Sequence, residues 1–472
     1  MSTENHTQLL VIGGGPGGYP AAFLAADLGL EVTIVDTNAN PGGVCLYSGC
    51  IPSKALLHAA KILSESRNAK ELGIDFGAPN IDIDKLRNWK EGIVKKLTIG
   101  LGQLSEQREV TLIQGKAAFI DSNTVRIEKE NGTEQVFGFK NSIIATGSRP
   151  NTISDMPESA RILDSTAALD LESIPKTMLL VGGGYIGLEL GTAYAEFGSR
   201  IDVVEMLPRI LTGADRDLVA IARKKLKTVF ADIMVETKVS SMEETKNGIK
   251  VTFENKDGKA SSKEYEKVLI AVGRRPNADN LGLENTKVSI NDQGFINVNA
   301  RRLTTDPSIY AVGDVTGHPM LAHKASHEGI TAAEAITGKK TAFEPKAIPA
   351  VVFTDPEIAW CGLTEAQAKD QNIEIRIAKF PWGASGRALT LGRSDGLTKL
   401  IIDPKTERIL GVAIVGANAG EMIAEGVLAI EMGAVVSDLK KCIHPHPTLS
   451  ETIMESAESF FGHATHIYNP KK

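Results

Sequence analysis

A glycine-rich motif in a fixed setting constrains this chain most. An apolar run at residues 8–12 leads into Gly13, Gly15 and Gly18, spaced G-x-G-x-x-G, and a predicted helix and a second apolar run ending at Asp36 follow. In such a unit the glycines let the backbone approach a pyrophosphate, and the acid accepts hydrogen bonds from ribose hydroxyls. The glycines alone would also suit a tight turn with a solvent-facing Asp36. In the strand–helix–strand setting they predict a dinucleotide-binding module.

The motif occurs a second time, at Gly182, Gly184 and Gly187, again between two apolar runs. The second run ends before Glu205, and the separation between the first glycine and this acid is the same as in the first copy. Two copies predict two dinucleotides. A carboxylate here accepts from the free 2′-hydroxyl of NAD and repels the 2′-phosphate of NADP, so Glu205 favours NAD. Arg209, four residues on, makes this preference moderate.

Length and composition exclude several classes of protein. The chain has 472 residues, enough for several domains, and its 52 basic and 58 acidic residues give a net charge of −6, which argues against nucleic acid as a partner. The sequence has no basic start followed by an apolar core and no apolar run of membrane-spanning length, so we expect neither a signal peptide nor a membrane span. Four cysteines do not make a secreted disulfide framework, so we expect a cytoplasmic protein.

The remaining patterns divide the chain. The segment 142–151 is echoed by 268–277, and a third strand-and-turn ends at Asp314. The fold class predicted is α/β, with two Rossmann-like dinucleotide-binding domains and a C-terminal α+β domain. Its parts are a first dinucleotide domain (1–150), a second (151–277), a central segment returning to the first (278–346) and the C-terminal domain (347–472). Other predicted elements are a helical stretch over 55–105, strands of a small antiparallel layer at 110–114 and 124–127, antiparallel strands at 397–402 and 409–415, and a helix around 421–432.

Cys45 and Cys50 form a close pair in a glycine-rich stretch. The pair could be a redox disulfide, half of a metal site or a coincidence. The other cysteines, Cys361 and Cys442, supply no second pair for structural zinc and are expected to be buried free thiols. A regular helix points positions five apart to different faces, so a bond needs a distorted backbone, which Gly49 permits. Because strained, accessible disulfides are easily reduced, a bonded pair is predicted to be catalytic.

The stretch 444–451 contains His444, His446, Pro447 and Glu451. Pro447 suits the first position of a helix, with His446 at its start and Glu451 about one turn in. A histidine held by a carboxylate is an oriented general base, but the same spacing suits a surface cap beside an incidental acid. A metal site at His444 and His446 is the weaker interpretation, because no further ligand is evident, and no metal is predicted.

Taken together, these features resemble the flavin-dependent pyridine nucleotide–disulfide oxidoreductases over essentially the whole chain. The resemblance rests on the two glycine motifs, the Cys45–Cys50 pair, Ala-Val-Gly-Asp ending at Asp314, and His-x-His-Pro-Thr-x-x-Glu near the C-terminus. It implies FAD in the first module, a nicotinamide cofactor in the second, and a redox disulfide against the flavin. It also implies an obligate homodimer, formed through the C-terminal domain, in which His446 and Glu451 reach the disulfide of the partner subunit.

The same resemblance implies a set of cofactor contacts. Lys54 is expected near the flavin, and Asp314 is expected at the ribityl or pyrophosphate region. The alternative interpretation of Lys54 is an exposed cation on a helix. His323 is expected to pack or to bond backbone rather than to act as a catalyst. The implied contacts are Gly13, Gly15, Gly18, Asp36, Gly43, Lys54, Ala117, Thr146, Gly147, Asp314, Ala322, Gly182, Gly184, Gly187, Glu205, Val239 and Gly273.

Within the family, the segment 45–56, Glu205 and a tail without cysteines look most like the members that oxidise protein-bound dihydrolipoamide with NAD. The implied partner is a lipoyl-bearing acyltransferase of a 2-oxo acid dehydrogenase complex, or a glycine-cleavage lipoyl protein. Alternatives are a glutathione-type, mercuric-type or diaphorase reductase, or a mainly docked subunit of such a complex. Two departures stand out: Tyr47-Ser48 replaces the usual Asn-Val between the cysteines, and Asp36 replaces the usual glutamate.

Overall fold

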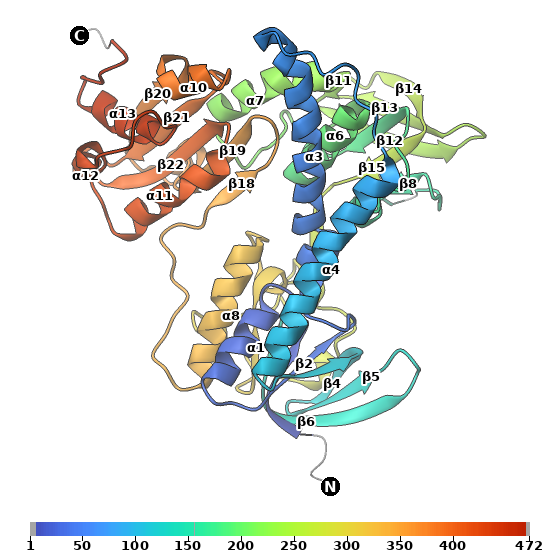
Figure 1. Ribbon diagram of the computed structural model, residues 1–472. Coiled ribbons are helices and arrows are strands. Elements are labelled where there is room, and N and C mark those ends of the chain that lie inside the picture. The colour runs from blue at the N-terminus through green and yellow to red at the C-terminus, as the bar shows by residue number, and fades with distance from the viewer. Residues whose placement is uncertain (1–5, 155, 469–472) are drawn as a thin grey trace.

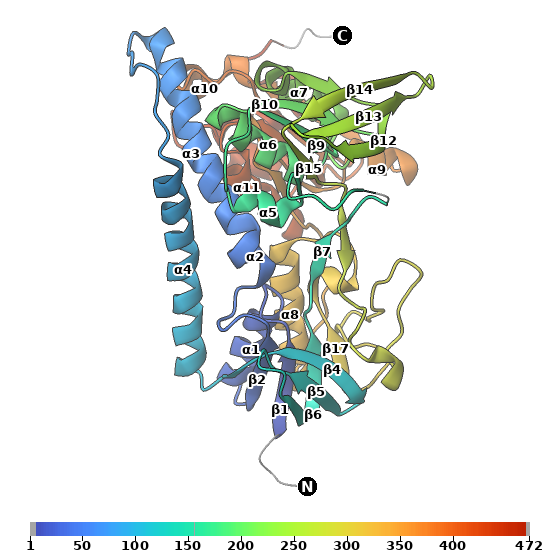
Figure 2. The ribbon, with the colours of Figure 1, turned by 90° about the vertical axis from the view of Figure 1, so that its right-hand side faces the viewer.

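The computed structural model describes residues 6–154 and 156–468. Residues 1–5, on which the expectation of no signal peptide rests in part, lie outside this range. In Figure 1 the sheet of the N-terminal unit lies at the bottom, that of the second unit at the upper right and that of the C-terminal unit at the upper left. The long helices α3 (Cys50–Asn68) and α4 (Ile83–Gln107) lie side by side and connect the first unit to the second (Figure 2).

The first glycine motif belongs to a seven-stranded sheet of order β3-β2-β1-β6-β5-β4, in which β17 also pairs with β6. The strands are β1 (His6–Ile12), β2 (Val32–Asp36), β3 (Thr111–Gln114), β4 (Lys116–Asp121), β5 (Thr124–Glu128), β6 (Glu134–Ile144) and β17 (Ile309–Ala311). The pairs β1–β2, β1–β6 and β6–β17 are parallel, as predicted. Assigning 110–114 to an antiparallel layer was wrong, because β3 extends the parallel sheet at the free edge of β2.

The helical stretch predicted over 55–105 contains two helices, α3 and α4, separated by η1 and a loop. Gly73 has φ +83° and ends the turn that follows α3, and Asp82 starts α4 by accepting a hydrogen bond from the backbone N–H of Lys85. The other helical elements of this unit are α1 (Gly18–Asp27), α2 (Gly43–Ser48), η1 (Ala69–Leu72), η2 (Leu283–Asn285), η3 (Gly313–Thr316) and α8 (Ala322–Ile336).

The second glycine motif begins another parallel sheet, of order β11-β10-β9-β15-β8. Its strands are β8 (Ile162–Leu163), β9 (Thr177–Val181), β10 (Arg200–Val204), β11 (Asp232–Met234) and β15 (Lys267–Ile270), and its helices are α5 (Ser165–Leu169), α6 (Tyr185–Phe197) and α7 (Arg216–Val229). A three-stranded antiparallel sheet flanks it: β12 (Thr237–Glu244), β13 (Ile249–Asn255) and β14 (Ala260–Tyr265). The antiparallel ribbon of β7 (Ser148–Pro150) and β16 (Arg274–Pro276) joins the two units.

The C-terminal unit is an antiparallel sheet of order β18-β19-β22-β21-β20 with helices, as predicted. Its strands are β18 (Ala350–Val352), β19 (Glu357–Gly362), β20 (Arg376–Pro381), β21 (Leu397–Ile402) and β22 (Ile409–Gly416). Its helical elements are α9 (Glu365–Asp370), η4 (Trp382–Ala384), α10 (Gly386–Thr390), α11 (Ala419–Glu431), α12 (Val436–Lys441) and α13 (Glu451–Phe460).

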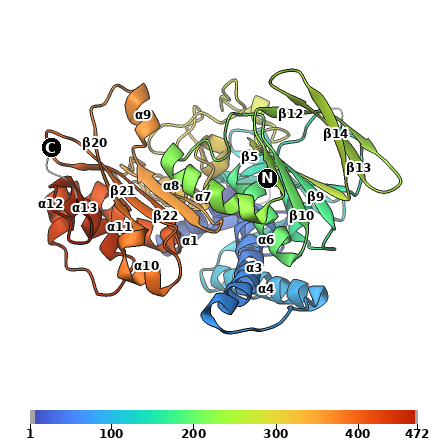
Figure 3. The same ribbon diagram turned by 90° about the horizontal axis from the view of Figure 1, so that it is seen from above.

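The second and third units share one hydrophobic core. Leu188 of α6 and Leu218 of α7 pack in the same cluster as Ile358 and Val415 of the C-terminal sheet. Viewed from above, α7 lies between the second sheet and strands β19 and β22 (Figure 3). Burying apolar faces of both units together fixes their relative position. Among the described residues, no helix combines the length and apolar character that crossing a bilayer requires.

Candidate active site

Each glycine motif forms a tight turn at its first position. Gly13 has φ +102°, and a Cβ there would lie 2.4 Å from the carbonyl oxygen of Ala145. Gly182 has φ +107°, and a Cβ there would lie 2.4 Å from the carbonyl oxygen of Ala271. Only glycine combines this dihedral angle with so close an approach. The repeat in the sequence is therefore a repeat of local structure.

The acids at the ends of the second strands turn back toward these glycines. The backbone N–H of Gly14 donates to Asp36 at 2.6 Å, and that of Gly183 donates to Glu205, also at 2.6 Å. The other carboxylate oxygen of each acid accepts from the backbone N–H two residues further on, at 2.8 and 2.7 Å. Both half-buried carboxylates are thus fixed beside a glycine turn, and the alternative of a free, solvent-facing Asp36 does not hold.

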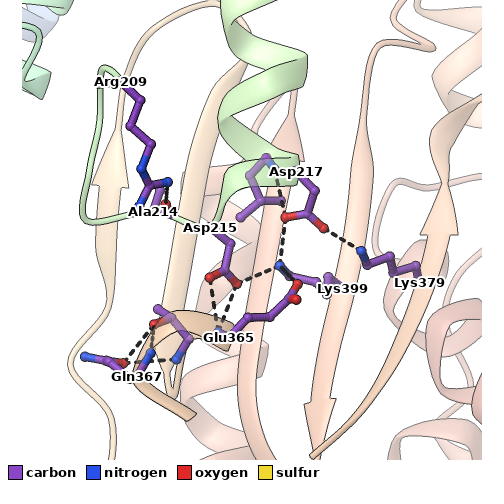
Figure 4. Close-up of polar contacts among 10 residues, drawn as sticks. Arg209, Ala214, Asp215, Asp217, Glu365, Gln367, Lys379 and Lys399 are labelled. Atoms are coloured by element: carbon purple, nitrogen blue, oxygen red, sulfur yellow. Dashed lines mark hydrogen bonds and ion pairs between the residues drawn. The ribbon is translucent and has the colours of Figure 1, made fainter. Parts of the chain in front are cut away.

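Arg209, which made the predicted preference for NAD only moderate, bonds to backbone carbonyls of its own loop. Its guanidinium donates to the carbonyl oxygens of Thr212 and Ala214, both at 3.0 Å, so the side chain is folded back into its own loop (Figure 4). A guanidinium held by two carbonyls is not poised to bind a 2′-phosphate. The charge next to the second glycine turn is then dominated by Glu205.

A cavity of about 960 Å³ lies where the first and second units meet. It includes both cysteines and most of the predicted cofactor residues. Those that line it are Gly13, Gly15, Asp36, Gly43, Lys54, Ala117, Thr146, Gly147, Asp314 and Ala322. Those that do not are Gly18, Gly182, Gly184, Gly187, Glu205, Val239 and Gly273. Gly18 lies under the turn, because a Cβ there would lie 1.8 Å from the carbonyl oxygen of Gly13, and the other six belong to the second unit.

The cavity fits a flavin dinucleotide. Its volume is at the upper end of the range for cofactor pockets. One wall is bare backbone: Gly15 and Gly43 approach so closely that a Cβ on Gly43 would lie 2.5 Å from the Cα of Gly15. Such a wall lets backbone reach a pyrophosphate, and Asp36 lines the same cavity as a ribose acceptor. The donor set is therefore that of a dinucleotide site.

A partly buried ion pair in this cavity involves a residue that sequence reasoning missed. Lys54 contacts Glu189 of α6 at 2.7 Å, and Glu189 is only 2% exposed. The second carboxylate oxygen accepts from the backbone N–H of Phe353, whose ring lies 4.4 Å from the Lys54 ammonium. Lys54 is thus not the free exposed cation of the alternative interpretation. An acid within the apolar helix after the second motif was the available signal, because a buried carboxylate needs a partner.

The two cysteines lie on either side of a break between helices. Cys45 belongs to α2, Cys50 begins α3, and Gly49 separates them. A Cβ on Gly49 would lie 2.7 Å from the carbonyl oxygen of Val44, so the close approach of the two helices requires glycine. This is the backbone distortion that a Cys45–Cys50 bond was predicted to need. Here both cysteines are thiols, and both line the cavity.

The thiols differ in acidity. The hydrogen bond from the Cys45 thiol lowers the pKa of Cys50 to about 7, against the effect of burial and with the help of the Lys54 ammonium. The same interaction, together with burial, raises the pKa of Cys45. Of the two thiols, Cys50 therefore loses its proton first, and Cys45 keeps its proton. A thiolate is the form that exchanges with disulfides.

His446 and Glu451 do form a pair, on the surface of the C-terminal unit. Nδ1 of His446 lies 2.9 Å from Glu451, and the imidazole is 74% exposed. The backbone N–H of Thr448 and then His446 hold the pKa of Glu451 below its usual range, against the effect of burial, so this acid is a carboxylate. Neither residue lines the cavity that contains the cysteines. A carboxylate at Nδ1 leaves Nε2 as the free acceptor of a general base.

The helix around this pair begins later than predicted. α13 starts at Glu451, and Pro447 precedes it after a cis peptide bond. Because the Glu451 carboxylate accepts from the backbone N–H of Thr448 at 2.8 Å, residues before Glu451 form a capping turn. Placing Pro447 at the first helical position was therefore wrong.

Three further predictions concern single residues. Nε2 of His323 lies 2.7 Å from the carbonyl oxygen of Pro349, which confirms a backbone-bonding role. Cys361 is a free thiol at 1% exposure, and burial raises its pKa to about 12. Cys442 is free but exposed, so its predicted burial was wrong: it follows the last turn of α12, where the chain turns toward solvent.

Comparison with known families gives two matches that together span most of the chain. Residues 7–329 match the pyridine nucleotide-disulphide oxidoreductase family, and residues 348–457 match its dimerisation domain. The chain belongs to this family. That membership confirms the predicted fold class and an oxidoreductase that uses FAD and NAD.

Individual relatives are similar over their full length. The chain is 47% identical to the dihydrolipoyl dehydrogenase of Vibrio parahaemolyticus over 472 residues, which cover 100% of the chain and 99% of that protein. It is 48% identical to the dihydrolipoyl dehydrogenase of Haemophilus influenzae, covering 100% and 98%. Among solved structures, LpdA from Mycobacterium tuberculosis superposes with a TM-score of 0.88 at 26% identity, covering 96% of this chain and 99% of that one. The flavoprotein disulfide reductase RclA from Escherichia coli gives 0.86 at 27%, with the same coverage.

Proposed function

We propose that the protein oxidises protein-bound dihydrolipoamide to lipoamide and reduces NAD to NADH. The observation that carries the proposal is the pair of thiols Cys45 and Cys50, which lie on either side of the break between α2 and α3 and both line a cavity of dinucleotide size. The full-length similarity to dihydrolipoyl dehydrogenases supports this choice of substrate.

The thiol half of the reaction follows from residues of the chain. In the oxidised enzyme Cys45 and Cys50 form a disulfide. His446 takes a proton from one substrate thiol, and the resulting thiolate attacks the sulfur of Cys45. The Cys45–Cys50 bond breaks, and Cys50 leaves as a thiolate, which its lowered pKa favours.

The second substrate sulfur completes the exchange. It attacks the first substrate sulfur, the S–S bond of lipoamide closes, and Cys45 leaves and takes the proton of the second thiol. The electron pair of the substrate ends on the cysteines, with one proton on Cys45 and one on His446. The chemistry that FAD supplies when bound is two-electron exchange between such a dithiol and a nicotinamide.

The residues that would hold the cofactors follow from the two turns. Gly13, Asp36 and Asp314, together with the other predicted residues lining the cavity, would hold FAD. Gly182 and Glu205 would hold NAD at the second turn, and Gly184, Gly187, Val239 and Gly273 stay predicted contacts of this site.

The active site is proposed to be shared between two subunits. His446 is exposed and lies outside the cavity that contains Cys45, within the residues that match the dimerisation domain. These observations support a homodimer in which each subunit's His446 and Glu451 reach the cysteines of its partner. The four-part domain division and the cytoplasmic location stay predictions. The lipoyl-bearing acyltransferase of a 2-oxo acid dehydrogenase complex, or a glycine-cleavage lipoyl protein, is the proposed partner.

The direct test is NAD reduction by dihydrolipoamide, with purified wild-type protein, Cys45→Ser, and glutathione disulfide plus NADPH as an alternative substrate pair. We expect a fast wild-type rate, its loss in Cys45→Ser, and no glutathione reductase activity. No rate from a wild-type protein whose flavin is reduced by NADH would mean that the disulfide substrate is another one.

The base is tested by His446→Gln. Removing the proton acceptor should slow dihydrolipoamide oxidation by about 10² to 10⁴-fold. Oxidation of NADH by an artificial dye, which needs no thiol proton transfer, should be unchanged. An equal loss of both activities would overturn the assignment of the base.

A further inference from the structure

A buried lysine is enclosed by three carboxylates, far along the chain from the cysteines. Lys399 of β21 is 0% exposed, and its Nζ lies 2.6 Å from Asp215, 2.8 Å from Asp217 and 2.7 Å from Glu365 (Figure 4). Lys379 of β20 contacts Asp217 at 2.6 Å from the exposed side. Neither the cavity nor the thiol chemistry uses this cluster, which we call the Lys399 cluster.

The cluster is a site already filled by a side chain. The carboxylate oxygens of Asp215, Asp217 and Glu365 lie close enough together to hold a metal ion. The Lys399 ammonium contacts all three and takes the position that such a cation would need. Burial opposes its charge, but the three carboxylates raise the pKa of Lys399 above its usual range, so it stays an ammonium. Buried charges of this kind are costly to separate once formed.

The cluster joins two different units of the molecule. Asp215 and Asp217 lie at the start of α7, in the unit of the second glycine motif, whereas Lys399 belongs to the sheet of the C-terminal unit. Asp215 also accepts from the backbone N–H of Glu365, at 3.1 Å, where α9 of the C-terminal unit begins. Figure 4 shows Asp215 and Asp217 pointing from the start of α7 toward the strands that carry the two lysines.

The same segment leads directly to the second dinucleotide turn. The loop 205–215 begins with Glu205, which accepts from the N–H of Gly183, and ends with Asp215 in the Lys399 cluster. Between these ends, the N–H of Leu211 donates to the carbonyl oxygen of Gly183 at 3.0 Å, and Arg209 holds the carbonyls of residues 212 and 214. Three sets of contacts thus fix the loop. It is bonded to the glycine turn at Gly183, to itself through Arg209, and to the C-terminal unit through Asp215.

We propose that Lys399 is a positioning residue for NAD binding. From the C-terminal unit it holds Asp215, and through Asp215 it fixes the loop 205–215 that begins with Glu205. The proposal rests on the proposed NAD site at the second turn. It makes the affinity for NAD depend on a contact with the unit that matches the dimerisation domain. The FAD cavity and the cysteines do not share this loop, so they are unaffected by the contact.

The test measures NAD binding to the FAD-loaded, full-length protein, by equilibrium dialysis, in the wild type and in Lys399→Met. Loss of the central charge should raise the Kd for NAD roughly tenfold and should speed amide hydrogen exchange over residues 206–214. The KM for dihydrolipoamide and the FAD content should not change. The matched control is Lys379→Met, which removes a lysine from the exposed side of the cluster and should leave the Kd within twofold, roughly.

Two further variants keep the test decisive. If Lys399→Met does not fold, Asp215→Asn keeps the shape of the side chain and should raise the Kd in the same direction, and Lys399→Arg should restore part of the affinity. An unchanged Kd for NAD in folded Lys399→Met or Asp215→Asn would overturn the proposal. A wild type that binds NAD but does not oxidise dihydrolipoamide would instead contradict the proposed function and leave this proposal intact.

Discussion

At the scale of single residues, the site depends on how charge is divided between two thiols. The interaction with the Cys45 thiol and the ammonium of Lys54 both lower the pKa of Cys50, so Cys50 is the thiol that ionises first. Glu189 keeps Lys54 in place, although its own charge acts in the opposite sense on Cys50. The pair therefore has one acidic sulfur and one that keeps its proton.

The pKa of about 7 predicts how the dithiol enzyme responds to pH. Because it lies below the value of 9.0 for an ordinary thiol, the Cys50 thiolate stabilises the fold fully above pH 9, and this contribution is lost as the pH falls through 7. The rate of alkylation of Cys50 should be half-maximal near pH 7, and Lys54→Met should move that midpoint upward. A midpoint near that of an ordinary thiol in the wild type would contradict the charge division.

The structure brings Cys45 close to Cys50 and His446 close to Glu451, and each of these pairs was recognisable from residue type and distance along the chain. The catalytic roles of the four residues stay predictions. Glu189 was missed because its partner Lys54 belongs to another unit, and such a pairing exists only after folding. Exposure of Cys442 could not be predicted either, because the burial of a thiol depends on how the folded chain packs around it.

At the scale of elements, the junction between α2 and α3 determines where the cysteines lie. Its backbone passes so close to residue 44 that a side chain at Gly49 has no room. The break at Gly49 agrees with the prediction that a bond between Cys45 and Cys50 needs a distorted backbone. Periodicity predicted a helical stretch over 55–105 but missed the loop between α3 and α4, because apolar spacing alone does not show where one helix ends and the next begins.

Gly49→Ala tests the junction. The added Cβ would lie 2.7 Å from the carbonyl oxygen of Val44, so the two helices must separate, and dihydrolipoamide oxidation should fall on the order of a hundredfold. Gly92→Ala is the matched control, because Gly92 is helical with open space around it, and it should raise stability by up to about 1 kcal/mol without changing activity. Equal activity in the two variants would show that the junction is not required.

At the scale of the whole molecule, the repeat of the glycine motif predicted two dinucleotide-binding units, each of which is built on parallel strands that flank its glycine turn. The strand pattern near the C-terminus predicted the antiparallel sheet of the third unit. The sequence could not predict the Lys399 cluster, since its members are spread from Asp215 to Lys399 and meet only when the second and third units pack. In the proposed shared site, the cavity of one subunit supplies the cysteines, and the exposed surface of its partner's C-terminal unit supplies the histidine.

The central claim, that Cys45 of one subunit works with the partner subunit's His446, is tested most directly by mixing two inactive homodimers, Cys45→Ser and His446→Gln. Half of the sites in each mixed dimer would combine an intact Cys45 with an intact His446. We therefore expect dihydrolipoamide oxidation to reappear after the subunits are dissociated and reassociated together. Verified mixed dimers without activity would contradict the shared site and would mean that Cys45 and His446 act within the same subunit.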